Sequence, residues 1–270
     1  MTGDVRIAAH PYGYTAVVED RDLYKAAEQI FSDLGRAGYD GIELMHTMLE
    51  PLGAEQEMGE FSRTHGVPII GSSFGGQMWD ASKTAEIIEQ TERITEQLQG
   101  LGAHQLAIST GAPGGPKTDD QLDTQADLIR RIIAICDGRG LQLNVHNHTY
   151  EMDYDQLEFK GMLERIPELR LGPDLNWLRI AGIDAWEFVR EYGDRIVFMH
   201  LRPQKGDMWM QTLAEGDEDW TQLAKVIDEI DFRGWVAVEL AFRPEHPVTR
   251  GMGQNYARCL DFLRATLRQK

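Results

Sequence analysis

Imidazole and carboxylate side chains recur at the ends of short apolar runs in the second half of the chain. An ionisable group inside such a run is costly to bury unless it is paired or binds a metal. Carboxylates that crowd together repel one another, and a divalent cation removes that repulsion. The residues with this placement are His146, His148, Glu151, Asp174, His200 and Glu239.

This mixture of oxygen and nitrogen donors suits Mn²⁺, Co²⁺, Zn²⁺, Fe²⁺ or Mg²⁺ and does not choose among them. The alternative is a buried salt-bridge network, or a set of polar residues unrelated to one another. A lone residue would favour that alternative. Residues in register on successive runs favour a metal site.

His146 and His148 stand two residues apart in the segment HNHTYE. An imidazole titrates near neutral pH and is suited to proton transfer. We expect one ring of the pair to act as a base and the other as an acid or a ligand of a carbonyl group. The alternative is that one ring only hydrogen-bonds near the backbone of the other.

Short β-rich runs alternate with longer amphipathic segments along the whole chain. Runs that are apolar at consecutive positions are typical of strands buried on both faces. The predicted strands are 5–9, 40–44, 67–72, 104–109, 141–146, 169–175, 195–201 and 235–240. The predicted helices include 20–37, 81–99, 219–230 and 252–268.

A further helix is predicted after Thr118, which begins a capping box with Gln121. Its apolar residues step by three and four, as one helical face does: Leu122, Ala126, Ile129, Ile133 and Cys136. Glycines stand before several strands, where helices commonly end in a left-handed residue. These are Gly38, Gly66, Gly102, Gly140 and Gly234.

Eight strand–helix units predict an α/β protein whose parallel strands close into a (β/α)₈ TIM barrel, a single domain over residues 1–270. The alternative is an open doubly wound sheet, which normally carries a glycine-rich phosphate turn after its first strand. The sequence there is HPYGY, which does not match. In a closed barrel the active site lies where the strands end, so the imidazoles and carboxylates are predicted to share one rim.

Acidic residues outnumber basic ones, 44 to 27, and the formal net charge is -17. Such a surface repels phosphate backbones and anionic lipid, so neither nucleic acid nor a membrane is an expected partner. Cys136 and Cys259 are too few for a disulfide framework, and we expect buried thiols. Because no signal-peptide pattern or bilayer-length apolar run is present, we expect a cytoplasmic protein.

The sequence resembles the sugar isomerase-like (xylose isomerase-like) TIM-barrel superfamily over essentially its whole length. That superfamily includes ketose 3-epimerases, hydroxypyruvate isomerase, inosose dehydratase, xylose isomerase and endonuclease IV. The matching phrases are GYDGIEL (38–44), VHNHTYE (145–151), GPDLNW (172–177), MHL (199–201), EGDEDW (215–220) and FRGWVAVE (232–239).

The resemblance implies one divalent metal, Mn²⁺ ahead of Co²⁺, Mg²⁺, Zn²⁺ or Fe²⁺, held by Glu151, Asp174, His200 and Glu239. It also implies a carbohydrate substrate and a homo-oligomer, and in some related lyases a small partner subunit. Endonuclease IV needs a multi-metal cluster and a DNA-binding surface, and the net charge argues against that branch.

Two departures from the superfamily pattern bear on the reaction. Ketose 3-epimerases usually show an Asn-Arg-aromatic-Glu run after strand five, whereas this chain has His146 and His148 around Asn147. The His-Asn-His form resembles inosose dehydratase and the enzymes that eliminate groups from 3-keto sugars, including C-glycoside deglycosidases. Many relatives follow the strand-seven histidine with a Lys-Asp pair, and Arg202-Pro203 stand there instead.

Three hypotheses result. The first is a metal-dependent lyase or dehydratase acting on a keto-sugar, inosose, 3-keto-glycoside or C-glycoside, with His146, His148, Glu151 and Glu239 as catalytic residues. The second is a ketose 3-epimerase or aldose–ketose isomerase, in which Glu151 and Glu239 bind the metal and shuttle protons. The third is a barrel that binds a sugar or a partner subunit without catalysis.

Other polar and aromatic residues near the strand ends are candidates for contact with the substrate. Glu43 could equally be a structural acid of the rim, Trp177 a core residue, and Trp209 part of a lid or an interface. Lys117 lies in a long loop, where it could meet a phosphate or a carboxylate, although a lysine in a loop is usually solvated. The predicted contacts are His10, Glu43, His46, Ser73, Trp79, Trp177, Arg202 and Trp209.

Overall fold

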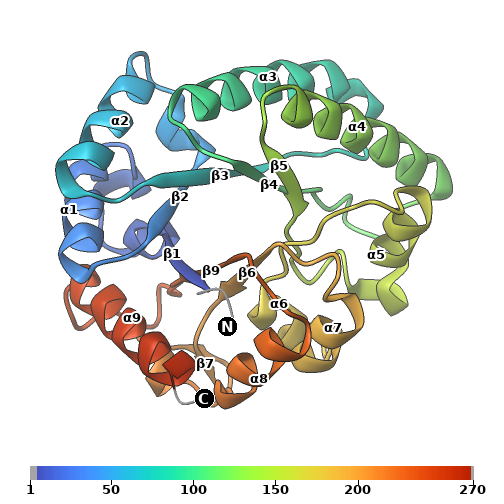
Figure 1. Cartoon of the computed structure of the whole chain (residues 1–270). Coiled ribbons are helices and arrows are strands. Elements are labelled where there is room, and N and C mark those ends of the chain that lie inside the picture. The colour runs from blue at the N-terminus through green and yellow to red at the C-terminus, as the bar shows by residue number, and fades with distance from the viewer. Residues whose placement is uncertain (1–4, 269–270) are drawn as a thin grey trace.

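Parallel strands alternate with helices in the computed structural model of the protein, which describes residues 5–268. The strands form a central ring and the helices surround it (Figure 1). The strands are β1 (Arg6–His10), β2 (Gly41–Met45), β3 (Ile69–Gly75), β4 (Gln105–Ser109), β5 (Gln142–Val145), β6 (Phe198–Leu201), β7 (Gln204–Lys205), β8 (Met208–Trp209) and β9 (Trp235–Glu239).

The α-helices are α1 (Ala27–Ala37), α2 (Ala54–His65), α3 (Thr84–Gly100), α4 (Asp119–Gly138), α5 (Asp153–Arg165), α6 (Leu175–Ile180), α7 (Ala185–Tyr192), α8 (Thr221–Glu229) and α9 (Met252–Arg268). Short 3-10 helices are η1 (Pro11–Ala16), η2 (Glu19–Arg21), η3 (His46–Leu49), η4 (Ala81–Lys83) and η5 (Leu213–Glu215).

The main sheet is a curved ring of parallel strands in the order β5-β4-β3-β2-β1-β9-β6. Bridges from Leu171 to Val145 and to Ile196 close the gap between β5 and β6. The prediction of a closed (β/α)₈ barrel is therefore confirmed. A separate antiparallel pair, β7 and β8, follows β6.

The predicted strand 169–175 was too long. Leu171 and Asp174 make isolated bridges only, because Pro173 has no N–H to donate and the Asp174 side chain caps α6. Gly172 passes so close to Asn144 that a β-carbon at residue 172 would overlap the Asn144 amide oxygen. This segment completes the barrel and then turns at once into α6.

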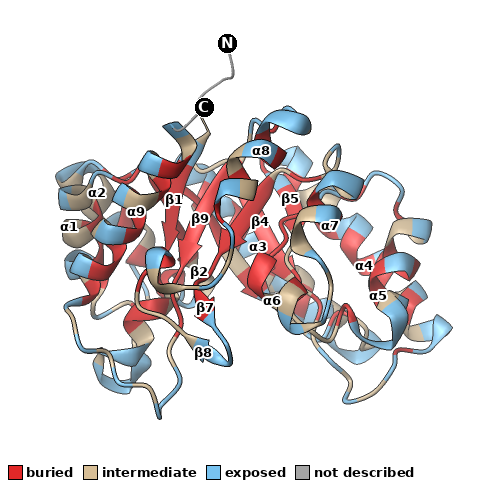
Figure 2. Ribbon diagram, turned by 90° about the horizontal axis from the view of Figure 1, so that it is seen from below, coloured by how far each residue is buried: buried red, intermediate tan, exposed pale blue. Residues whose placement is uncertain are grey.

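Most residues of the barrel strands are buried, whereas the helices and the β7–β8 hairpin carry exposed residues (Figure 2). On α4 the predicted apolar stripe is buried, except that Ile133 is half-buried while its neighbour Ile132 is fully buried. The capping box of Thr118 and Gln121 is present. Cys136 and Cys259 are buried and free, as predicted.

Two local predictions were wrong. Helix α1 begins at Ala27 rather than near residue 20, because the Asp22 side chain accepts the Tyr24 N–H in a turn just before it. Gly234 does not have the expected left-handed conformation, which the nearby Asp231 adopts with φ 50°. A β-carbon at Gly234 would instead collide with the Val197 carbonyl, so close approach explains this glycine.

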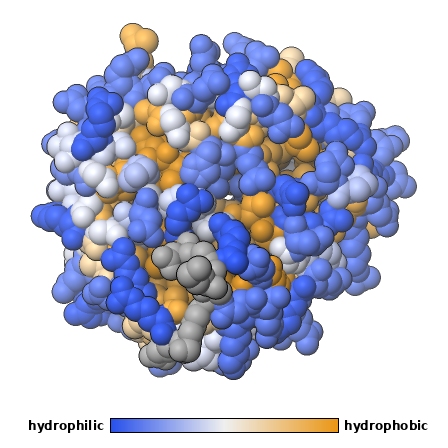
Figure 3. Space-filling model, in the orientation of Figure 1, coloured by the Kyte–Doolittle hydropathy of each residue, from blue (hydrophilic) through white to orange (hydrophobic). Residues whose placement is uncertain are grey.

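Hydrophilic side chains cover most of the face of the barrel seen in Figure 3, which is the face where the strands begin, with hydrophobic residues visible between them. No helix within residues 5–268 combines the length and the apolar character needed to cross a membrane.

Candidate functional site

Strand register brings the predicted residues to one end of the barrel. Residue His10 at the end of β1 pairs with Glu239 at the end of β9. Asp174 forms a bridge with His200 on β6. Because all strands of the ring are parallel, the ends of the other strands meet at the same rim.

A cavity of about 320 Å³ opens at this rim. Of the predicted substrate contacts, all except Glu43 and Trp79 line it. Its walls are His10, Tyr12, Met45, His46, Ser73, Phe74, Gly75, Ala107, Ile108, Ser109, His146, His148, Trp177, His200, Arg202, Trp209 and Glu239. This mixture of rings, imidazoles and a few charged groups is typical of a small-molecule site.

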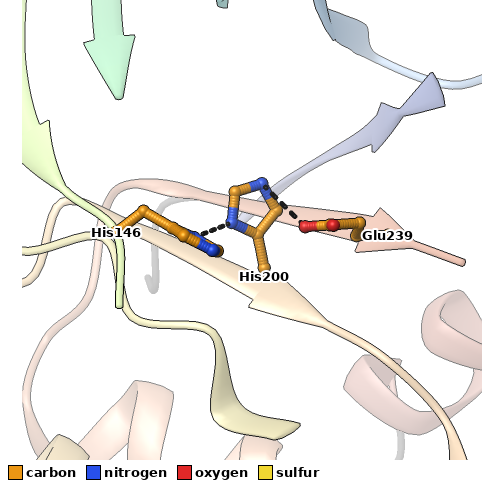
Figure 4. Close-up of side chains that lie close together, drawn as sticks. All are labelled: His146, His200 and Glu239. Carbon is orange, nitrogen blue, oxygen red and sulfur yellow. Dashed lines mark hydrogen bonds and ion pairs between the residues drawn. The ribbon is translucent and has the colours of Figure 1, made fainter. Parts of the chain in front are cut away.

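Three side chains in the cavity could hold a metal ion: His146, His200 and Glu239 offer ligand atoms that all lie within 4.8 Å of one another. They come from the ends of β5, β6 and β9 and converge in Figure 4. The Nδ1 atoms of His146 and His200 are 2.9 Å apart. His200 Nε2 lies 3.7 Å from Glu239 Oε2.

Glu43 supports this group from behind and does not reach the cavity. Its side chain is fully buried, and Oε2 accepts a hydrogen bond of 2.6 Å from His200 Nε2. A carboxylate partner of this kind fixes the orientation and tautomer of a metal-binding histidine. The contacts of Glu43 therefore fit a structural acid of the rim and not a residue that contacts the substrate.

Buried charge at the rim also fits a divalent cation. The carboxylates of Glu43, Asp174 and Glu239 are buried, and Arg202 is the buried guanidinium among them. Three carboxylates and one guanidinium leave two negative charges, which a proton on His200 matches in part and a divalent cation would match in full. This charge balance fits a site that takes a doubly charged ion.

The imidazoles respond to this charge in opposite directions. Burial disfavours a charged His200, but Glu43 and Glu239 outweigh burial and raise its pKa to about 9. Burial and the nearby His200 hold the pKa of His146 well below its usual value. His200 can thus donate its Nδ1 proton to a neutral His146, and a cation can replace that proton between the two rings.

Arg202 lies between two of the predicted metal ligands. One nitrogen, Nη2, donates to Asp174 Oδ2 at 2.9 Å and to Glu239 Oε1 at 2.7 Å. The guanidinium carbon lies 5.1 Å from the ring centroids of both Trp177 and Trp209. Burial opposes ionisation of Glu239, yet Arg202 holds the pKa of that carboxyl well below its usual range.

The structure does not bring Glu151 to the other predicted ligands. Glu151 lines a neighbouring, largely apolar cavity beneath α5. Its Oε2 accepts the backbone N–H of His148 at 2.7 Å, and Oε1 lies 3.4 Å from the Thr110 hydroxyl. Its contacts therefore give it a local role, which is to fix the turn that carries His148.

Behind Glu151 lies an ion pair that sequence reasoning missed. Lys117 Nζ lies 2.7 Å from Glu158 Oε1, and both side chains are buried. Thr110 and Gln125 also hydrogen-bond Glu158. Lys117 is thus not solvated but meets a carboxylate, which was the other alternative considered for it, since the loop folds back and ties the end of β4 to α5.

His148 faces the cavity with one nitrogen already engaged. The Tyr150 hydroxyl hydrogen-bonds Nδ1 at 3.1 Å, and the two rings stack with centroids 5.1 Å apart. The Trp177 ring lies 5.6 Å away, and the His146 ring 4.9 Å away. Because a hydroxyl can both donate and accept, Tyr150 can accompany either tautomer, which leaves Nε2 for a substrate.

Trp209 closes one side of the cavity. It lies on the β7–β8 hairpin, and its indole N–H donates to Asn176 Oδ1 at 3.0 Å. Trp79 is half-buried and does not line the cavity. Phe74, Ile108 and Ser109 were not predicted to line it, although they lie at the ends of β3 and β4, where the barrel prediction pointed.

Comparison with known proteins gives the family. Residues 31–266 match the family described as xylose isomerase-like TIM barrel. The chain belongs to this family. The resemblance inferred from the sequence phrases is thus confirmed.

Individual relatives in the family carry out different reactions. The chain is 22% identical over 260 residues to an inosose dehydratase of Geobacillus kaustophilus, covering 82% of this chain and 83% of that protein. Its fold matches a D-allulose 3-epimerase of Methylomonas sp. with TM-score 0.79 and 18% identity, covering 98% of both chains. It matches a 3-keto-D-glucoside 4-epimerase of E. coli with TM-score 0.74 and 17% identity, covering 97% of this chain and 100% of that one.

Proposed function

We propose that this protein is a metal-dependent lyase or dehydratase that removes a proton beside the carbonyl of a keto-sugar and then expels a β-substituent. Inososes, 3-keto-glycosides and C-glycosides are the candidate substrates. One observation carries the proposal: His148 lines the same cavity as the His146, His200 and Glu239 group, with a ring nitrogen left for the substrate.

His146, His200 and Glu239 would hold the ion, with Mn²⁺ as the first candidate. A divalent ion bound there would polarise the substrate carbonyl and make the adjacent C–H more acidic. Glu43 orients His200 for this purpose, since it occupies the opposite ring nitrogen. Of the two histidines His146 and His148, it is therefore His146 that would bind the metal.

His148 then moves the proton. Its Nε2 takes the proton from the carbon beside the carbonyl and returns it to the departing atom of the leaving group, an oxygen in an inosose or O-glycoside and a carbon in a C-glycoside, while Tyr150 keeps the ring in place through Nδ1. Glu151 fixes the backbone of the same turn. Trp177 and Trp209 offer flat apolar faces to the sugar ring.

The position of His148 supports elimination, because expulsion of a leaving group benefits from a general acid and this imidazole lines the cavity. Glu151, a proton carrier in both the lyase and the epimerase hypotheses, does not line it. The inosose dehydratase relative supports the same choice. A ketose 3-epimerase or aldose–ketose isomerase is the second candidate, because structures of epimerases share the fold.

Proton NMR in D₂O tests the proposal on two probes, 2-keto-myo-inositol and a 3-keto-glucoside, with Mn²⁺ present. Loss of the proton beside the carbonyl together with release of water or aglycone is the expected result. Deuterium uptake without release would instead establish the epimerase. If Mn²⁺ is bound and neither exchange nor release is seen, the third hypothesis of a non-catalytic barrel is favoured.

A further inference from the structure

The carboxylate of Asp174 has both of its oxygens occupied. Oδ1 accepts the backbone N–H groups of Asn176 at 2.8 Å and Trp177 at 3.1 Å, which caps the start of α6. Oδ2 accepts from Arg202 Nη2. The side chain is fully buried, so the Asp174 carboxylate is committed to the fold and to Arg202.

Arg202 is held in place from several sides. Its Nη2 is shared between Asp174 and Glu239, and its guanidinium carbon lies 5.1 Å from the ring centroids of both Trp177 and Trp209. Only 3% of the residue is exposed. Moving the guanidinium away would break two charge-assisted hydrogen bonds and two cation–π contacts at once.

A cation bound to both Asp174 Oδ2 and Glu239 Oε1 would lie close to Arg202 Nη2, which donates to both oxygens. Two positive charges this close in a buried site repel strongly. Glu239 can offer Oε2 instead, since Arg202 takes only Oε1. Asp174 cannot do the same, because Oδ1 already accepts the two backbone N–H groups at the start of α6.

We propose that Arg202 excludes Asp174 from the metal's coordination shell. The ion is then held by His146, His200 and Glu239, and the remaining positions are open to the substrate. A site with two imidazoles, one carboxylate and open positions is the type that binds substrate directly to the metal. This inference rests on the metal-dependent function proposed above, and it departs from the ligand set that the sequence resemblance implies.

Calorimetric titration with Mn²⁺ alone tests the ligand set without any substrate. D174N is the informative variant, because asparagine can still cap α6. We expect D174N to weaken Mn²⁺ binding by about tenfold, the lower end of the effect of losing an indirect partner, and H146Q and E239Q to weaken it by well over 100-fold. R190M, which removes an exposed arginine on α7, is the control.

A double-mutant cycle separates exclusion by Arg202 from a simple change of charge. R202M is expected to bind Mn²⁺ more tightly than the wild type, since Asp174 becomes free to coordinate. In the R202M variant, D174N should then weaken Mn²⁺ binding by 100-fold or more. Electron spin echo spectroscopy of bound Mn²⁺ should show nitrogen couplings from both imidazoles in the wild type and in D174N, and fewer in H146Q.

The inference would be overturned if, with Arg202 present, D174N weakened Mn²⁺ binding as much as H146Q does. It would also be overturned if D174N weakened Mn²⁺ binding equally with and without Arg202. If the protein binds no Mn²⁺ but still exchanges the proton of the keto-sugar, the inference about the metal ligands is overturned. The proposed abstraction of that proton would then stand without it. If the double-mutant cycle gives the expected result but neither keto-sugar is turned over, the inference about the metal ligands is supported and the proposed function is refuted.

Discussion

The Nδ1 atoms of His146 and His200 face each other at 2.9 Å, although 54 residues separate them in the sequence. Two aromatic nitrogens at that distance must share a proton or a cation. The hydrogen bond from His200 Nε2 to Glu43 leaves only Nδ1 for this purpose. The pair therefore identifies where an ion would enter, at the ends of β5 and β6.

Metal loading should stabilise the fold. At a free Mn²⁺ concentration about 100 times its Kd, binding adds about 2.7 kcal/mol to the free energy of unfolding. For a chain of this size we expect Tm to rise by roughly 5–10 °C. Differential scanning calorimetry with Mn²⁺, and again after a chelator, measures the shift; an unchanged shift in E239Q would contradict the assignment of Glu239.

His148 should control proton transfer and leave metal binding intact. H148N is expected to lower kcat by about 10²- to 10⁴-fold, the usual contribution of a positioned acid–base group. Y150F should lower it less and displace the pH profile, because Nδ1 loses its partner. Steady-state kinetics and Mn²⁺ titration of both variants check this; normal turnover by H148N would rule out His148 as the proton carrier.

Trp209 should contribute to substrate binding and to the position of Arg202. The guanidinium carbons of Arg202 and Arg243 each lie 5.1 Å from the centroid of its ring. Because partly desolvated cation–π contacts are worth about 1–2 kcal/mol, W209A should raise KM by about tenfold. W186A, at a packing contact with Trp220, is the matched control and should leave KM unchanged.

The buried pair of Lys117 and Glu158 should be important for stability. K117M leaves the Glu158 carboxylate buried without its cation, which typically costs about 3–5 kcal/mol. Urea denaturation measures the loss. The double variant K117M/E158L, which removes both charges, should recover most of it; a double variant as unstable as K117M would show that the packing of the Lys117 stem matters more than charge.

The loss of unfolding free energy in K117M, relative to the wild type, should depend on pH. Burial raises the pKa of Glu158, and Lys117 opposes that rise. Without Lys117 the folded-state pKa lies further above the unfolded value, so protonated Glu158 favours folding at low pH and that advantage is lost as pH rises through the folded pKa. Unfolding curves at pH 5 and pH 8 should show a smaller deficit at pH 5, and K117M/E158Q should show little difference between the two.

Much of the architecture was predictable because it depends on periodicity. Consecutive apolar positions mark strands buried on both faces, and eight strand–helix units demand closure. The same logic placed His10, Ser73, His146, His200 and Glu239 at one rim before any contact was known. Strand 169–175 was overestimated because hydrophobicity does not reveal that Asp174 turns away to cap α6.

What the sequence alone determined is which strand ends carry ionisable groups at the rim, since strand order and direction follow from the pattern. Only the tertiary structure decided how those groups pair. Glu151 lies three residues beyond His148 and accepts its backbone N–H, a local contact that keeps it out of the cavity. Arg202 takes Asp174 and one oxygen of Glu239, because a guanidinium with several donors satisfies two buried carboxylates at once. Such choices depend on distances between side chains from different strands, which spacing along one chain does not contain.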